Sequence, residues 1–427
     1  MLEFYGLFPV IVSFIVVKLC HWIYRWTNPK CKGKLPPGSM GFPIIGETFE
    51  FMTAYDFSSA VSPYLEKRIS RYGSKVFRTS LFGAKAIIST DQEVNMEMAK
   101  ASTQCGAPES LRRLFGENSD FLQRKEIHKY VRNLTSRFVG PENLKNRLLQ
   151  DIDVLSRNYF KIEKGATSIS FDIKEAATKM EVELIVKKVF GEMESEAVRE
   201  LGLCWTAFRT NWFNFSYNFP GTTVYRLVKA RRRAAKLLKG LIQKKNASKE
   251  GLGDFLDIDR AVDLILTFFI ISQETTPTIL GATVKLVADN PDVMEELKVI
   301  KESLRFTSAQ PTVHRIPTED VQIGGYTIPA GWFFFGIPLV HFDEEKYEDP
   351  LKFNPWRWKG KYLHGTLSKD YIPLCVGSEF AKCIIAVFLH HLSIFRWSLD
   401  PKTRVLRRYM LMFPAGCKVE IAKEPSS

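Results

Sequence analysis

The sequence contains no Cys-x-x-Cys pair, no internal repeat and no low-complexity tract. Its seven cysteines are odd in number and widely scattered, which argues against both a zinc site and the framework of a disulfide-rich secreted domain. Acidic residues are outnumbered, because 60 lysines and arginines face 47 aspartates and glutamates, and the formal net charge is +13. A charge of this sign suits an anionic membrane surface or an acidic protein partner. It would also suit nucleic acid, but no nucleic-acid-binding motif is present, and we expect no such partner.

Long apolar runs are scarce too, and the longest lies at the N-terminus. Residues 4–24 are interrupted only by Lys18 and His21, and this stretch is long enough to cross a bilayer as a helix. No basic residue precedes it and no Ala-x-Ala-like site follows it, so a retained anchor over residues 1–26 is favoured over a cleaved signal peptide. The basic residues that come directly after the anchor place the body of the protein in the cytosol by the positive-inside rule.

The rest of the chain is predicted to be mainly helical, with a smaller β region. A proline- and glycine-rich elbow over residues 27–46 leads into a single body over residues 47–427. Two short strands are predicted between residues 76 and 89, and a helical pattern follows to about residue 290. The two glycines within residues 321–328 indicate a hairpin, and with a third strand over residues 332–336 it would form a small antiparallel sheet.

Two local features suggest chemistry in apolar surroundings. Cys375 lies at the predicted start of an apolar helix, where the positive end of the helix dipole stabilises a thiolate and favours metal ligation. A buried thiol that packs like a small hydrophobe is the alternative for a lone cysteine. Glu274 and Thr275 lie in the middle of the apolar helix predicted over residues 259–289. At such positions a threonine commonly bonds to its own helix, and a buried glutamate commonly belongs to an ion pair.

Two further features carry charge. Glu302 and Arg305 have the i,i+3 spacing of an ion pair on a helix, an arrangement that is common on protein surfaces. Arg357 lies in the aromatic segment Phe-Asn-Pro-Trp-Arg-Trp over residues 353–358, from which it could reach a carboxylate elsewhere. Any one of the four features can arise by chance, but their joint occurrence in this order indicates one functional site.

With these features in this order, the sequence resembles the cytochrome P-450 family of haem-thiolate monooxygenases, and most of all the plant branch that oxidises steroids and triterpenoids. The resemblance extends from the proline elbow to residues 414–416. It implies a P-450-like helical fold with small antiparallel sheets and an N-terminal transmembrane helix. It also implies haem b as the cofactor, with Cys375 as the axial thiolate ligand of the iron.

Further residue roles are implied by the same resemblance. Glu302, Arg305 and Arg357 match the triad that braces the loop presenting the cysteine. Glu274 and Thr275 match the acid–alcohol pair that handles protons during oxygen activation.

Contacts with the haem propionates are implied for three other residues. His128 and Arg132 match residues of an early helix that contact the propionates, and Arg315 matches a later contact. Two arginines would thus face two carboxylates in charge-assisted hydrogen bonds.

The resemblance also implies partners and a location. Electrons would come from NADPH through a membrane-bound flavoprotein reductase whose docking surface is acidic, which suits the positive net charge. The implied reaction hydroxylates a small hydrophobic substrate, similar to a sterol or a triterpenoid, with O2. Together with the predicted anchor, this describes a single-pass protein of the endoplasmic reticulum membrane with a cytosolic catalytic body.

The sequence departs from the family pattern directly before the cysteine. The family has a phenylalanine, a glycine-rich bulge and a basic residue there, whereas Pro373 and Leu374 immediately precede Cys375 in this chain. A second segment is missing between Leu297 and Val299, where relatives insert further helices. Two alternatives follow from these departures. One is a truncated or splice-variant relic of the fold without stable haem or activity, and the other is a sterol-binding protein.

Overall fold

The computed structural model describes residues 2–101, 103–104, 116, 133, 140, 143–163, 165–191, 199–204, 220–247, 258–294, 298–308, 313–360, 371, 378–408 and 410–422. By its internal contacts the chain divides into two compact units. The first contains Met1–Thr53, Val61–Gly106 and Thr312–Ile337, and the second contains Ala54–Ala60, Ala107–Pro311 and Pro338–Ser427. Each unit therefore combines segments that are distant in the sequence.

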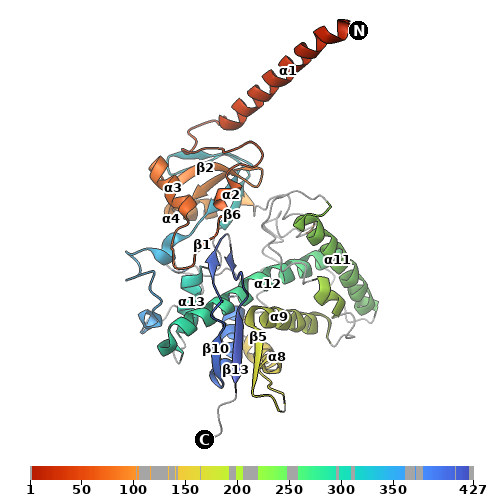
Figure 1. The fold of residues 1–427 in the computed structure, drawn as a ribbon, viewed down its shortest axis with the longest axis vertical. Helices are drawn as coiled ribbons and strands as arrows, with labels where there is room; N and C mark the ends of the chain where they lie inside the picture. Colours follow the sequence, from red (N-terminus) through yellow and green to blue (C-terminus); the bar gives the residue numbers. More distant parts are fainter. Residues whose placement is uncertain are drawn as a thin grey trace. The chain divides into compact units, whose positions relative to one another are not determined.

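The first unit is built around a five-stranded sheet with the strand order β2-β3-β9-β6-β4 (Figure 1). Its strands are β2 (Val76–Leu81), β3 (Ala84–Ser89), β4 (Thr103–Gln104), β6 (Val313–Pro317) and β9 (Phe333–Gly336). The predicted pair of strands between residues 76 and 89 is present as the antiparallel hairpin β2–β3. β9 comes from the last third of the chain and lies parallel to β3.

The predicted hairpin over residues 321–328 is present as β7 (Val321–Ile323) and β8 (Tyr326–Ile328). Gly324 and Gly325 have φ angles of 58° and 75°, the left-handed conformation that a two-residue hairpin turn requires. The third strand is present, but it does not extend this hairpin as predicted. β9 enters the larger sheet between β3 and β6, because its pairing depends on strands that are far away in the sequence.

The helices of the first unit are α1 (Leu2–Thr27), α2 (Thr48–Phe51), α3 (Pro63–Tyr72) and α4 (Gln92–Lys100). α3 shows why these segments are helical: the Ser62 side chain caps its first turn by accepting a hydrogen bond from Leu65 N, and Gly73 ends it in the left-handed conformation. α1 is long and apolar enough to cross a membrane by length and composition, and residues 10–25 are exposed. Near its end, Trp26 packs against the core of the first unit.

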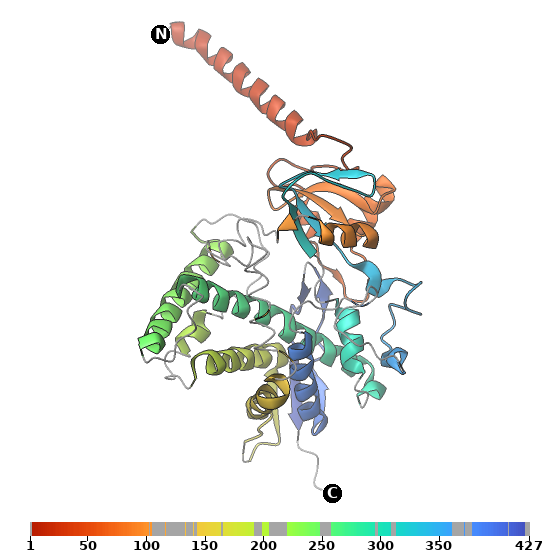
Figure 2. The same ribbon diagram turned by 180° about the vertical axis from the view of Figure 1, so that it is seen from behind.

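The second unit is mainly helical (Figure 2). Its helical elements are the π-helix η2 (Leu144–Leu148), α8 (Leu149–Tyr159), α9 (Ile173–Phe190), α11 (Thr223–Ala247), α12 (Ile258–Asp289), α13 (Val299–Thr307), α14 (Ser378–Ser393) and the 3-10 turns η3 (Pro291–Val293), η4 (Leu339–Phe342) and η5 (Pro355–Trp358). α12 is the long apolar helix predicted from the sequence. It also passes the length and composition test for a membrane span, but 71% of it is buried, which identifies it as a core helix.

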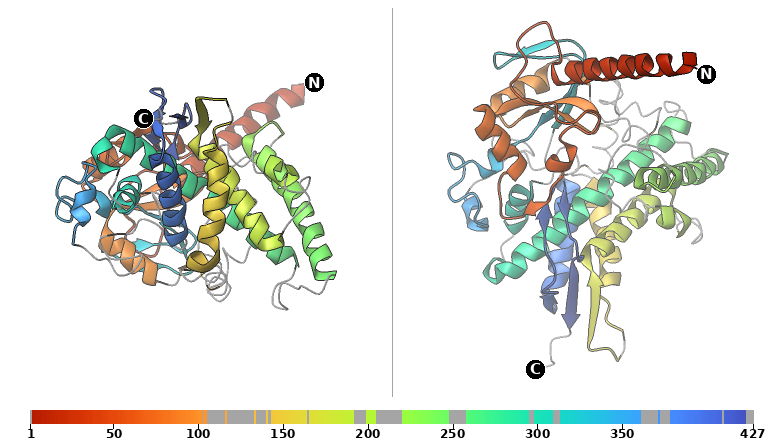
Figure 3. Two further views of the ribbon diagram at one scale, coloured as in Figure 1. Left: turned by 90° about the horizontal axis from the view of Figure 1, so that it is seen from below. Right: turned by 45° about the horizontal axis from the view of Figure 1, so that its top comes forward.

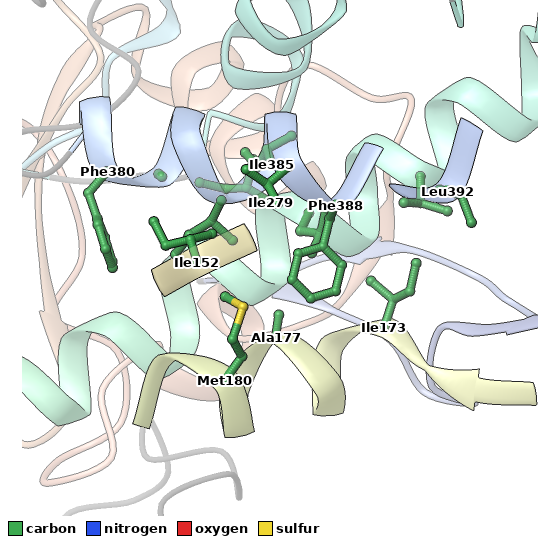
Figure 4. Close-up of a cluster of buried hydrophobic side chains, with 14 of the residues drawn as sticks. Ile152, Ile173, Ala177, Met180, Ile279, Phe380, Ile385, Phe388 and Leu392 are labelled. Carbon is green, nitrogen blue, oxygen red and sulfur yellow. The ribbon is translucent and has the colours of Figure 1, made fainter. Parts of the chain in front are cut away.

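The core of the second unit forms where α8, α9 and α14 pack around α12. Figure 4 shows Ile152 of α8, Ala177 and Met180 of α9, and Phe388 of α14 converging on Ile279 of α12. Figure 3 shows α14 beside α8, and these two helices are in contact. Burial of these large apolar side chains is the main force that holds the helices together.

Two small antiparallel sheets complete the second unit. β11 (Leu406–Arg407) lies between β1 (Tyr55–Asp56) and β12 (Leu411–Met412), and β13 (Lys418–Ala422) lies between β5 (Ser168–Asp172) and β10 (Arg396–Leu399). Asp172 ends β5 and begins α9, because its side chain accepts a hydrogen bond from Glu175 N. The structure thus confirms the predicted class, which is mainly α with smaller β regions.

Candidate active site

A buried glutamate and arginine lie one helical turn apart on α13. The Arg305 guanidinium donates to both carboxylate oxygens of Glu302, from Nε to Oε2 at 3.0 Å and from Nη2 to Oε1 at 2.8 Å. Both side chains are fully buried, with an exposed fraction of 0%. The i,i+3 spacing in the sequence is typical of an ion pair on the surface. The structure instead shows a bidentate pair inside the core, which is the strongest form of this interaction.

Glu302 accepts three further hydrogen bonds, all from the aromatic segment around η5. Arg357 Nε donates to Oε1 at 3.1 Å, and the backbone N–H of Asn354 reaches the same oxygen at 3.1 Å. The indole Nε1 of Trp358 donates to Oε2 at 2.8 Å. One carboxylate therefore ties α13 to the segment that leads toward Cys375.

The two arginines are also satisfied by backbone carbonyls. Arg305 Nη1 donates to the carbonyl of His341, and Arg357 donates to the carbonyls of Glu348, Asp349 and Lys352. Two guanidinium groups facing one carboxylate would leave excess positive charge in the core, and these carbonyl dipoles compensate for it. The predicted triad of Glu302, Arg305 and Arg357 is thus assembled, and it fixes the path of residues 341–358.

His341 shows how strongly this region disfavours a further charge. Its ring is buried, and burial lowers its pKa to about 3, with contributions from the nearby Arg305 and Arg407 guanidinium groups. The histidine is therefore neutral at any physiological pH. Arg407 is buried as well and donates to Phe306 and Thr307 carbonyls at the end of α13, so it closes the C-terminal turn of the helix that carries the triad.

The chain is fixed on both sides of the predicted cysteine ligand. Tyr371 is buried, its hydroxyl donates to the Lys301 carbonyl at 3.2 Å, and its ring contacts Trp358 edge to face at 5.2 Å. α14 starts at Ser378. The cysteine therefore follows a residue anchored to the triad helix and precedes the first turn of α14. The bracing before the cysteine and the helix start after it are both present, and a helix start favours the thiolate that would hold a haem iron.

The predicted acid–alcohol pair lies on the buried helix α12. Thr275 is half-buried and Thr276 is 4% exposed. The backbone of Glu274 belongs to the same turn, while its side chain lies outside the described part of the chain. Pro277 follows directly, and a proline inside a helix leaves the carbonyl four residues earlier without its helical N–H donor.

The remaining predicted site residues are distributed as follows. Cys375, His128 and Arg132 lie outside the described residues, and their roles stay predictions. Arg315 lies on β6 in the first unit, where its Nη1 donates to the carbonyl of His314 at 2.8 Å. Its predicted contact with a haem propionate also stays a prediction.

Two residues of this site were not identified from the sequence. Trp358 supplies one of the five hydrogen bonds to Glu302, and Tyr371 connects the cysteine segment to α13. Trp358 directly follows the predicted Arg357 in an aromatic segment, which was a usable signal. Tyr371 could not be assigned in this way, because its partner is a backbone carbonyl that carries no sequence signature.

Comparisons with known proteins agree with this arrangement. The family model for cytochrome P450 matches residues 297–417, which include the triad and Cys375. A curated relative from Arabidopsis thaliana, cytochrome P450 708A2, is 32% identical and covers 97% of this chain and 98% of its own length. The beta-amyrin 16-alpha-hydroxylase of Maesa lanceolata is 29% identical over the same shares of the two chains.

The alignment with the Arabidopsis protein extends over 470 positions, more than the 427 residues of this chain. The relative therefore carries segments that this chain lacks. Among solved structures, the retinoic acid-bound cyanobacterial CYP120A1 matches with a TM-score of 0.76 at 20% identity and covers 92% of this chain. This likeness shows that the two proteins share a fold.

Proposed function

The chain belongs to the cytochrome P450 family of haem-dependent monooxygenases, and from that membership we propose that it is a membrane-anchored enzyme that hydroxylates a polycyclic triterpenoid or sterol. The observation that carries the proposal is the intact bracing of the cysteine segment, in which Glu302 accepts five hydrogen bonds that connect α13, η5 and, through Trp358, Tyr371.

Cys375 would hold the haem iron through its thiolate, and Arg132, Arg315 and His128 would hold the propionates. When bound, the haem group supplies the redox chemistry by which one atom of O2 enters a C–H bond. The described residues on either side of the cysteine are anchored. Tyr371 donates a hydrogen bond to the Lys301 carbonyl, and α14 begins three residues after Cys375.

Protons would be handled on α12. Glu274 and Thr275 stand next to each other in a helix whose other residues are mostly apolar and buried. A carboxyl group beside a hydroxyl group can hold and pass a proton at Oε of the acid and Oγ1 of the alcohol, and the surrounding apolar residues exclude competing water.

The substrate class is supported by the relatives. The Maesa lanceolata protein carries the name of a hydroxylase of beta-amyrin and aligns with 97% of this chain. A rigid, apolar polycycle also suits an enzyme tethered to a membrane, because such substrates partition into lipid. We propose α1 as the anchor in the endoplasmic reticulum membrane, with the rest of the protein in the cytosol. The proposed partner is a flavoprotein reductase that takes electrons from NADPH.

The test is made on the full chain expressed in membranes. Reduced, carbon monoxide-treated protein is expected to show the red-shifted Soret band of a haem-thiolate centre, and Cys375→Ser is expected to abolish it. Cys383→Ser on α14 is the matched control and should leave the band intact. Folded wild-type protein without this band would contradict the proposal and favour the haem-free relic.

The third possibility, a sterol-binding protein, is distinguished by turnover. With reductase, NADPH and O2, the wild-type protein is expected to convert a member of a triterpenoid and sterol panel into a product heavier by one oxygen atom. Tight sterol binding that is unchanged in Cys375→Ser, without any turnover, would favour the binding protein instead.

A further inference from the structure

A buried acid on α9 faces the α12 turn that carries the predicted proton-handling pair. Glu181 has an exposed fraction of 0%, and its neighbours on the same helix face, Ala177 and Leu184, belong to the apolar core. α9 and α12 pack against each other in the second unit. The hydroxyl of Thr276 on α12 interacts with the Glu181 carboxyl group.

Within the described part of the chain, neither carboxyl oxygen of Glu181 has a hydrogen bond of normal geometry. The Thr276 hydroxyl is near enough to favour the charged form, but it is a poor hydrogen-bond partner in this geometry. Burial dominates and raises the pKa of Glu181 well above its usual value. An unpaired carboxylate in such surroundings would be very costly, so the group is a carboxylic acid with one donor and one acceptor.

The α12 turn opposite Glu181 also contains a proline and a buried hydroxyl that has no hydrogen bond among the described residues. Pro277 has no N–H, so the carbonyl of Gln273 lacks its helical donor. The hydroxyl of Thr278 is buried and accepts or donates no hydrogen bond among the described residues. Elsewhere in α12 threonines bond back to their own helix: Thr267 donates to Asp263 and Thr283 donates to Ile279. Thr278 therefore differs from these two threonines.

Buried polar groups without a protein partner are normally satisfied by an ordered water molecule that makes two to four hydrogen bonds. The Glu181 carboxyl group and the Thr276 hydroxyl supply two such partners at one place, and the Gln273 carbonyl belongs to the same turn of α12. We propose that Glu181 holds a water molecule between α9 and α12, against the turn that Pro277 opens, and so acts as a positioning residue for Glu274 and Thr275.

This inference rests on the proposed function, because positioning matters only if Glu274 and Thr275 handle protons. Thr276 is the direct neighbour of Thr275. A water molecule that binds the Thr276 hydroxyl therefore also restrains the α12 backbone at Thr275. The water molecule would thus add a hydrogen-bonded contact between α9 and the turn that carries the two reacting side chains. The expected defect is then electrons lost to peroxide or water instead of product.

Three variants of the full chain test the proposal. Glu181→Leu removes the polar group at nearly constant volume, Glu181→Gln keeps the ability to bind water, and Glu183→Gln is the matched control at an exposed position of α9. We expect Glu181→Leu to melt at or above the wild-type temperature, since it removes a buried polar group. Its product yield per electron should nevertheless fall roughly tenfold, which corresponds to ~1.4 kcal/mol. Glu181→Gln should restore most of that yield with an unchanged KM.

The proposal is overturned if Glu181→Leu couples electrons to product as well as the wild type. It is also overturned if both Glu181 variants lose stability and yield together, because the residue would then be structural. An infrared measurement is independent of haem. Wild type and Glu183→Gln should show the carbonyl stretch of a protonated, hydrogen-bonded carboxylic acid that both Glu181 variants lack. This band would persist if the chain failed to bind haem, so failure of the proposed function and failure of this inference are distinguishable.

Discussion

Glu302 accepts hydrogen bonds from five donor atoms. The stability of the fold is therefore expected to be sensitive to small changes in the partners of Glu302. Its carboxylate compensates two buried guanidinium groups, one indole N–H and one backbone N–H. Removing one member of a buried charged network costs more than the contact itself contributes, because the remaining groups stay buried without a partner. The contributions of single residues can therefore be separated by conservative substitutions.

Trp358→Phe is expected to lower the free energy of unfolding by about 2 kcal/mol, since it removes one hydrogen bond to a charged acceptor and leaves that oxygen with fewer donors. Urea unfolding of the full chain measures the change. Trp356→Phe is the matched control two positions earlier, because Trp356 is 46% exposed and should change stability by less than about 0.5 kcal/mol. Equal effects of the two substitutions would contradict the assigned role of the indole.

Because His341 is buried in its neutral form, the free energy of unfolding is expected to decrease in acid. Its pKa is about 3 in the folded chain and about 6.5 when unfolded, so the unfolded state binds the proton first. The stability due to the neutral histidine is complete above pH 6.5 and falls as the pH decreases toward 3, by about 2 kcal/mol at pH 5. The difference between the unfolding midpoints at pH 7.5 and pH 5 should become smaller in His341→Gln, while the buried His314, whose pKa is lowered to about 4, keeps part of it. The midpoints should keep the wild-type difference in His390→Gln, whose side chain is exposed.

Among the elements, the loop before α2 is the most tightly constrained by backbone geometry. Gly46 has a φ of 65°, and a Cβ there would meet the Ser80 carbonyl oxygen at 2.0 Å. Gly73 has a similar φ of 58°, but no atom lies within 4 Å of its hypothetical Cβ. The same substitution at the two sites therefore separates backbone strain from a steric clash.

Gly73→Ala is expected to cost about 1 kcal/mol, which is the strain of a left-handed alanine. Gly46→Ala should cost at least about 3 kcal/mol, because backbone must also move away from Ser80. Thermal unfolding of both variants provides the comparison. A Gly46→Ala protein as stable as Gly73→Ala would show that the loop can shift freely.

Secondary structure was predictable wherever the local signal was strong. The hairpins β2–β3 and β7–β8 and the long helix α12 all follow from periodicity and turn residues. The partners of β9 did not follow, because parallel pairing with β3 has no local signature. In the candidate site, the order of motifs identified Glu302, Arg305 and Arg357. It did not reveal Tyr371 or Glu181, whose importance arises from tertiary contacts with a carbonyl and with a helix from elsewhere in the chain.

At the scale of the whole molecule, the first unit depends on a segment from the last third of the chain. β9 lies between β3 and β6, and Ile323, Ile328, Trp332 and Phe334 fill the core beneath the sheet. Without residues 312–337, β3 would have a bare edge and the core would lose these side chains. A fragment of residues 28–106 is therefore expected not to fold cooperatively by circular dichroism, and linking it to residues 312–337 should restore a cooperative transition. Cooperative melting of the short fragment alone would contradict this dependence.

The divided first unit also has a consequence for biosynthesis. Residues 61–106 leave the ribosome more than 200 residues before β6 and β9 are made, an interval of roughly 10 to 40 s at ordinary elongation rates. During this time the edge of β3, with Ile87 and Ile88, has no partner strand and can pair with other nascent chains. Successful production of this protein should therefore depend on chaperones that shield the early strands until translation is nearly complete.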